Sequence, residues 1–166
     1  RNDTKYLLAY TIPLSSITGL QVGGVWSFTT VLYAFGLIPL WEAFLEPDQS
    51  KLSEEKIKNR LSNRFFDLML YFNLIIVFAI LIFGIKHLTT QTLATYEKVG
   101  LVLSFGIVLG TNGINVAHEL GHRKTKWERF LAKVLLMPAF YMHFYIEHNF
   151  GHHLNVGTPS DPATSK

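Results

Sequence analysis

The 166-residue chain contains no cysteine, and this absence excludes several kinds of site at once. Zinc ribbons, iron–sulfur clusters held by thiolates and cysteine nucleophiles all need a sulfur atom. A secreted module held together by disulfides is excluded for the same reason. Any metal that the protein holds must therefore be bound through nitrogen or oxygen atoms.

Formal charge is also scarce along much of the chain. Residues 6–41 carry no charge, and residues 68–85 and 101–117 form two more uncharged runs. A helix of a soluble protein keeps one polar face in water, so runs of this length are not expected there. The pattern excludes a disordered chain and a nucleic-acid binder with a basic surface, and it predicts a membrane protein with several spans.

The uncharged runs predict an all-α helical bundle with four membrane spans. A helix rises 1.5 Å per residue, so about 20 residues cross about 30 Å of hydrocarbon. The four spans are expected near residues 5–20, 25–45, 65–85 and 98–117. A shorter apolar stretch, residues 130–146, is expected to form an interfacial helix.

The distribution of Lys and Arg predicts how this bundle is oriented. With four spans, the start of the chain, the polar loop 46–64 and everything after residue 117 lie on the same side. Leaving out the last residue, that side carries twelve Lys and Arg residues, and the other side carries two. The positive-inside rule therefore places residues 118–166 on the cytoplasmic side of a transmembrane region, 1–117. Within the loop, a short surface helix is expected near Ser53.

Five of the seven histidines lie in two short clusters, HELGH at residues 118–122 and EHNFGHH at residues 147–153. These histidines are His118, His122, His148, His152 and His153. Residues four apart differ by only about 40° around an α-helix, so each cluster presents one pair on one face. The last of the five is turned by a further 100° and is expected to face elsewhere, where it would bind a second metal or bridge two metals.

Imidazole binds iron, copper, nickel and zinc, and five imidazoles exceed the needs of one tetrahedral zinc ion. HELGH also matches the H-E-x-x-H pattern of zinc peptidases, in which Glu119 would act as the general base. That interpretation leaves the second cluster without a role. Three hypotheses stay open: an oxygen-activating pair of redox metals, an intramembrane zinc metallopeptidase, and a non-catalytic subunit for metal binding or transport.

Three motifs carry a resemblance to a known family: HELGHR at 118–123, EHNFGHH at 147–153 and NVGTPSDPATS at 155–165. Together they resemble the integral-membrane alkane monooxygenases, or alkane 1-hydroxylases, of the histidine-rich membrane di-iron group. The H-x-x-x-H-H spacing of the second motif distinguishes this branch from most desaturases. Arg123 stands where the family usually has Lys, and Gly157 and Ser160 replace Ala and Glu. The family's later histidine motifs and two further spans do not occur here, so the chain resembles an N-terminal portion.

The resemblance implies terminal hydroxylation of medium- or long-chain n-alkanes to primary alcohols at two non-haem irons. It further implies O₂ as co-substrate, rubredoxin as electron donor and a location in the bacterial inner membrane. The five clustered histidines are then the expected iron ligands, although they do not complete a di-iron site.

Several other residues are candidates for the site. Glu119 and Glu147 are predicted to act in catalysis or to orient the imidazoles, and the same orienting role is predicted for Asn115 and His143. Two more candidates for orientation are Asn112 and Asp161, the latter interpreted chiefly as a turn former. A set of basic residues is predicted either to dock the electron donor or simply to reflect membrane topology. These residues are Arg123, Lys124, Lys126 and Arg129.

Overall fold

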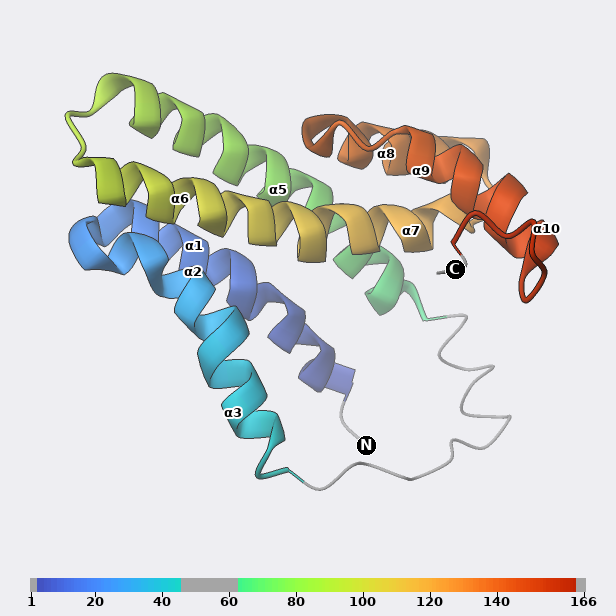
Figure 1. Ribbon diagram of the computed structural model, residues 1–166, viewed down its shortest axis with the longest axis horizontal. Coiled ribbons are helices and arrows are strands. Elements are labelled where there is room, and N and C mark those ends of the chain that lie inside the picture. The colour runs from blue at the N-terminus through green and yellow to red at the C-terminus, as the bar shows by residue number, and fades with distance from the viewer. Residues whose placement is uncertain (1–2, 46–62, 164–166) are drawn as a thin grey trace. The chain divides into compact units, whose positions relative to one another are not determined.

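The computed structural model describes residues 3–45 and 63–163, and these residues form helices and turns without any strand (Figure 1). The predicted all-α class is therefore confirmed for the described part of the chain. The chain divides into two compact units, Arg1–Val108 and Leu109–Lys166. The surface helix expected near Ser53 lies outside the described residues.

Three helices of the described chain are long and apolar enough to cross a membrane. They are Gly24–Glu42 with 19 residues, Arg64–Thr90 with 27 and Thr95–Gly121 with 27. They coincide with three of the four expected spans. The remaining expected span, near 5–20, forms a helical segment Asp3–Val22 that is not among these three, and its role as a span stays a prediction.

The first unit consists of helical elements, of which α5 and α6 lie side by side (Figure 1). Their bounds are η1 Asp3–Tyr10, α1 Thr11–Val22, η2 Gly24–Phe28, α2 Thr29–Leu32, η3 Tyr33–Leu37, α3 Ile38–Glu42, α5 Arg64–Thr90 and α6 Thr95–Val108. Three of them depart from α-helical geometry: η1 and η2 are 3₁₀ helices and η3 is a wider π-helix.

Close packing in the first unit depends on small residues where η2 meets α6. A Cβ atom placed on Gly100 would lie 2.4 Å from Ser27 Oγ and 2.9 Å from Phe28 Cδ2, so only glycine fits at this position. One turn later, the Ser104 hydroxyl donates a hydrogen bond to the Ser27 carbonyl oxygen over 2.9 Å. Small and hydroxyl side chains let helix backbones approach each other closely within lipid.

The turn between α1 and η2 is held by a carboxylate from α6. Gly23 and Gly24 adopt φ angles of 68° and 58°, which side chains with a Cβ atom rarely adopt. Glu97 accepts hydrogen bonds from the Gly24 N–H over 2.6 Å and from the Ala94 N–H over 2.8 Å. The same side chain therefore caps the start of α6 and fixes the hairpin at that end.

The second unit begins with the π-helix η4 and is built around α7, which packs against α8. Its elements are η4 Leu109–Ile114, α7 Asn115–Gly121, α8 Lys126–Leu136, η5 Met137–Ala139, α9 His143–Ile146, η6 Glu147–His152 and α10 His153–Asn155. Thr125 and Glu128 contact each other at the start of α8, in the positions of a capping box. Ala132, Leu135 and Leu136 are buried on one face of α8.

The stretch 130–146, expected as one helix, is broken into two by a turn between α8 and α9. Pro138 lacks a backbone N–H and so cannot continue the hydrogen bonding of α8. Phe140 then takes a left-handed conformation, with φ 51°, and its side chain is 92% exposed. The break starts a new helix at His143, immediately before the second histidine cluster.

Two glycines of α6 provide a direct test of the close packing. Gly100→Ala is expected to lower the free energy of unfolding by about 1–3 kcal/mol, because the new Cβ atom collides with Ser27 and Phe28. Thermal unfolding in detergent measures the change. Gly106→Ala is the matched control, since no atom lies within 4 Å of its added Cβ atom; it is expected to be neutral or to stabilise by up to about 1 kcal/mol. Equal effects of the two substitutions would contradict the packing.

Candidate metal centre

The first histidine pair lies on α7, as its spacing predicts. His118 and His122 are one α-helical turn apart, and their Nε2 atoms are 2.8 Å from each other. The opposite face of α7 is buried, with Ala117 and Leu120 almost inaccessible. The helix is thereby fixed by packing on one side while it presents both imidazoles on the other.

The second cluster presents a different pair from the one that α-helical spacing predicts. Its residues form a π-helix, Glu147–His152, and the His153 N–H donates to the carbonyl oxygen of His148, five residues earlier. This wider turn brings His153 over His148, and their Nε2 atoms are 3.0 Å apart. His153 therefore joins the group that contains His148. The His152 ring stacks on that of His148, with centroids 5.4 Å apart, but His152 is not one of the four grouped histidines. Single π-helical turns occur often at functional sites.

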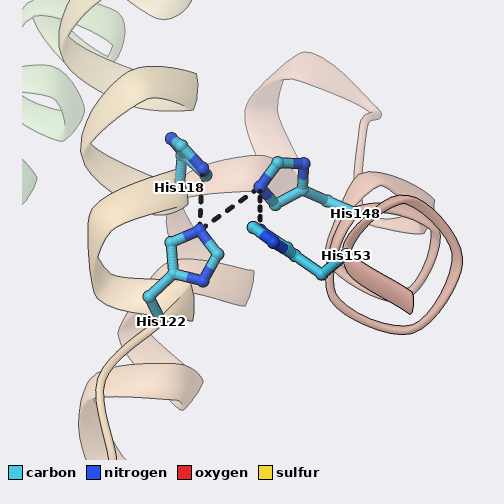
Figure 2. Close-up of side chains that lie close together, drawn as sticks. All are labelled: His118, His122, His148 and His153. Carbon is cyan, nitrogen blue, oxygen red and sulfur yellow. Dashed lines mark hydrogen bonds between the residues drawn. The ribbon is translucent and has the colours of Figure 1, made fainter. Parts of the chain in front are cut away.

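The two pairs meet at one point within the second unit (Figure 2). The Nε2 atoms of His122 and His148 are 3.2 Å apart and connect α7 to the second cluster. One ring nitrogen from each of the four histidines lies within 4.8 Å of all the others. These four are His118, His122, His148 and His153.

Hydrogen bonds between the rings cannot satisfy this arrangement. The three short contacts run in a chain through four Nε2 atoms, and each Nε2 carries either one proton or one lone pair. Each nitrogen can thus take part in one such bond, so at most two of the three contacts are hydrogen bonds. A cation that accepts all four lone pairs resolves the conflict. With metal–nitrogen bonds of about 2.1 Å, ligands at right angles lie about 3.0 Å apart, close to the spacings seen here.

The environment of His148 favours the neutral, metal-binding form of its ring. Desolvation lowers the pKa of His148 to about 4, with a further contribution from the neighbouring imidazoles. The Phe144 ring stacks on His148 with centroids 4.8 Å apart and planes inclined by 18°. This contact limits the directions in which the imidazole can turn. A set of four imidazole nitrogens fits a metal that prefers nitrogen ligands.

His152 has a partner of its own in the tail that follows the cluster. Its Nδ1 atom lies 2.9 and 3.0 Å from the two carboxylate oxygens of Asp161, which is buried. A carboxylate in this position holds the proton on Nδ1 and leaves the Nε2 lone pair free to bind a metal. Asp161 therefore does more than form a turn. The clue in the sequence is an acidic residue in a proline-containing tail just beyond the last histidine.

The tail reaches His152 because of a glycine. A Cβ atom on Gly151 would lie 2.9 Å from Pro162 Cγ, so the tail packs directly on the backbone of η6. The Ala163 N–H also donates to Asp161 Oδ1 over 2.9 Å, which fixes the carboxylate. Gly151 and Pro162 thus act together to position Asp161.

The structure does not bring the other predicted site residues into this group. Glu119, Glu147 and Asn115 are exposed, and their side chains make no hydrogen bond within the described residues. His143 lies against Tyr141, with ring centroids 4.7 Å apart. Asn112 is buried and accepts a hydrogen bond from the Thr111 hydroxyl. The catalytic and orienting roles expected of these residues stay predictions.

The chain matches one family model and several known proteins. Residues 97–166 match the fatty acid desaturase family. Over 97% of its length, the chain is 37% identical to alkane 1-monooxygenase 1 of Alcanivorax borkumensis, and it covers 41% of that protein. An alkane 1-monooxygenase of Pseudomonas putida is 39% identical over 80% of the chain and 33% of its own length. The chain is a homologue of the alkane 1-monooxygenases.

This homologue is also similar to the hydroxylase component of a xylene/toluene monooxygenase of Pseudomonas putida, at 26% identity over 96% of the chain. It spans about two fifths of the length of the relatives that it matches most fully. The expected resemblance to membrane alkane monooxygenases is confirmed, and so is the expectation that the chain corresponds to only a part of such a protein.

Acidification of the metal-free protein tests the environment of His148. In an unfolded chain its imidazole takes up a proton near pH 6.5, and in the folded protein it does so only near pH 4. The unfolded state therefore binds more protons between these values, and this contribution to stability is lost as pH falls from 6.5 toward 4. NMR of histidine-labelled protein, with His148→Gln for assignment, measures the midpoint. A midpoint near 6.5 would contradict the desolvation of this ring by its neighbours.

Asp161→Asn tests the positioning of His152. An amide donates a hydrogen bond to Nδ1 as readily as it accepts one, so the proton is expected to move to Nε2 in a large fraction of molecules. Nitrogen chemical shifts of the metal-free protein report this tautomer directly. The metal affinity of the site that uses His152 is expected to fall about 10–100-fold. Glu119→Gln is the control with the same change of charge; if it shifts the tautomer equally, the pair has no specific role.

Proposed function

We propose that the chain is part of a membrane monooxygenase that hydroxylates the terminal carbon of medium- or long-chain n-alkanes to primary alcohols. The convergence of HELGH with the second histidine cluster on one point is the observation that carries this proposal. It is supported by the similarity to alkane 1-monooxygenases along almost the whole chain. O₂ is the proposed co-substrate, and rubredoxin is the proposed electron donor.

Two non-haem irons are the proposed cofactor. His118, His122, His148 and His153 would hold one of them, and the Nε2 atom of His152 would contribute to the other. These five histidines alone do not complete a di-iron site. Bound iron would supply the redox and O₂ chemistry of the hydroxylation.

Residues of this chain would set the protonation and orientation of the histidines that bind iron. Asp161 holds the proton on Nδ1 of His152, and the depressed pKa keeps His148 neutral in the physiological range. Phe144 covers one face of the His148 ring. Glu119 and Glu147 directly follow and precede metal-binding histidines, and we assign them the handling of protons. An alkane has no polar group, so an apolar channel between helices must select it.

The proposed topology has four spans, with the helical segment Asp3–Val22 as the first. Helix α8 is the proposed interfacial element. The histidines are proposed to lie on the cytoplasmic side of a bacterial inner membrane, in a region 118–166 that follows the transmembrane region 1–117. The excess of Lys and Arg on that side supports this orientation.

A basic segment beside the histidines is the proposed docking site for an acidic electron donor. Arg123 and Lys124 lie in the turn between α7 and α8, and Lys126 and Arg129 lie on α8. Their charge is the support for this assignment.

The zinc peptidase hypothesis is less well supported. A catalytic zinc ion has three protein ligands and an open position for water. Four imidazoles around one point fill a tetrahedral site, and they include two residues that the peptidase motif does not require. The metal content of the purified protein separates the two hypotheses.

Removal of one imidazole tests the proposed function. His118→Ala in the full-length protein is expected to lower iron affinity at least about a hundredfold and to abolish formation of 1-alkanol from an n-alkane. Elemental analysis and gas chromatography measure the two effects. His87→Ala is the matched control, since His87 lies on α5 in the first unit, and it should change neither. One zinc per chain, or alkanol formation by the His118 variant, would overturn the proposal.

A further inference from the structure

A groove outside the histidine group runs along α8 in the second unit. Its volume is about 850 Å³, and it lies between α8 and the segment that begins at His143. The residues that line it are Lys126, Arg129, Lys133, Met142, His143, Tyr145, Ile146 and Phe150. None of them is acidic. The groove therefore combines positive charge with apolar surface, and none of the four metal-binding histidines lines it.

The positive charge comes from one face of α8. Lys126, Arg129 and Lys133 are spaced by three and four residues, so their side chains project from the same stripe of the helix. The Lys133 ammonium lies 4.8 Å from the centre of the Tyr145 ring, a cation–π contact that holds it against the groove. Ammonium and guanidinium groups side by side form a site for a phosphate or carboxylate oxygen.

The apolar part comes from the segment on the other side of the groove. Met142, Ile146 and Phe150 line it at intervals of four residues, and their side chains are 46%, 63% and 61% exposed. Large apolar side chains also flank α8 itself, where Trp127 and Phe130 are more than half exposed. So much exposed apolar surface beside cations is typical of helices that lie at a membrane surface.

We propose that this groove binds an anionic phospholipid. The phosphate diester would contact Lys126, Arg129 and Lys133, and the first part of the acyl chains would lie against Met142, Ile146 and Phe150. The charge of the groove complements that of the lipid, and the same chain carries three helices suited to a bilayer. The inference does not depend on the proposed reaction, because it uses no metal-binding residue.

An acidic protein is the alternative occupant, since Lys126 and Arg129 also belong to the proposed donor-docking segment. Charges that steer a soluble partner usually lie in a polar, hydrated rim. Here the cations border exposed apolar side chains. A soluble acidic protein surface would offer these side chains no apolar contact. The observations therefore favour an amphiphilic ligand.

The test compares phosphatidylglycerol with phosphatidylcholine on the full-length protein. Binding of each lipid to protein in neutral detergent is titrated and counted by native mass spectrometry. The variant K126Q/R129Q/K133Q is expected to bind phosphatidylglycerol about a hundredfold more weakly, as the loss of three surface cations implies. The control K5Q/R64Q/K98Q removes the same charge from exposed positions elsewhere and should stay within about twofold of the unaltered protein.

A second variant tests the apolar wall. M142S/I146S is expected to weaken binding of phosphatidylglycerol but not that of glycerophosphoglycerol, its headgroup without acyl chains. Circular dichroism establishes that each variant is folded. Equal affinity for the two lipids, or equal losses in the triple variant and its control, would overturn the proposal. So would a triple variant that keeps its lipid affinity and instead needs more rubredoxin for half-maximal turnover, because the groove would then dock the donor.

Discussion

Four imidazole nitrogens crowded around one point are the constraint on which the second unit depends. Their contacts exceed what hydrogen bonds between neutral rings can satisfy, and protonation would add repulsion. The arrangement is stable only if a cation accepts the lone pairs or if the surrounding packing holds the rings in place. Buried residues fix α7 from behind, and Phe144 stacks on His148 from the side. The fold thus prepares a site for a metal before the metal binds.

A local departure from α-helical geometry gives the histidines of the second cluster different partners. The π-helical turn brings His153 over His148 and turns His152 toward Asp161. Adjacent residues in the chain therefore serve different purposes: one joins the four-imidazole group, and the other is oriented by a carboxylate. In a regular α-helix, His152 rather than His153 would lie on the same face as His148. The extra residue in the turn is what places two adjacent histidines against different partners.

The apolar and basic surfaces around this centre suit a protein that works at a membrane. Three long helices are apolar enough to cross a membrane. Close to the histidines in the chain, α8 combines a buried face with cations and exposed aromatic residues. Such a helix can lie at the bilayer surface. The similarity to alkane 1-monooxygenases agrees with both features.

The sequence by itself determined the all-α class, three helices long enough to span a membrane and the pairing of His118 with His122. These features depend on uncharged runs and on a period of 3.6 residues, which are local properties. Only the tertiary structure decided that His153 rather than His152 joins the group and that Asp161 reaches His152. Each of these depends on a shifted hydrogen bond or on a contact between distant residues, such as Gly151 with Pro162. Residue spacing carries no record of such contacts, because they form only when the chain packs against itself.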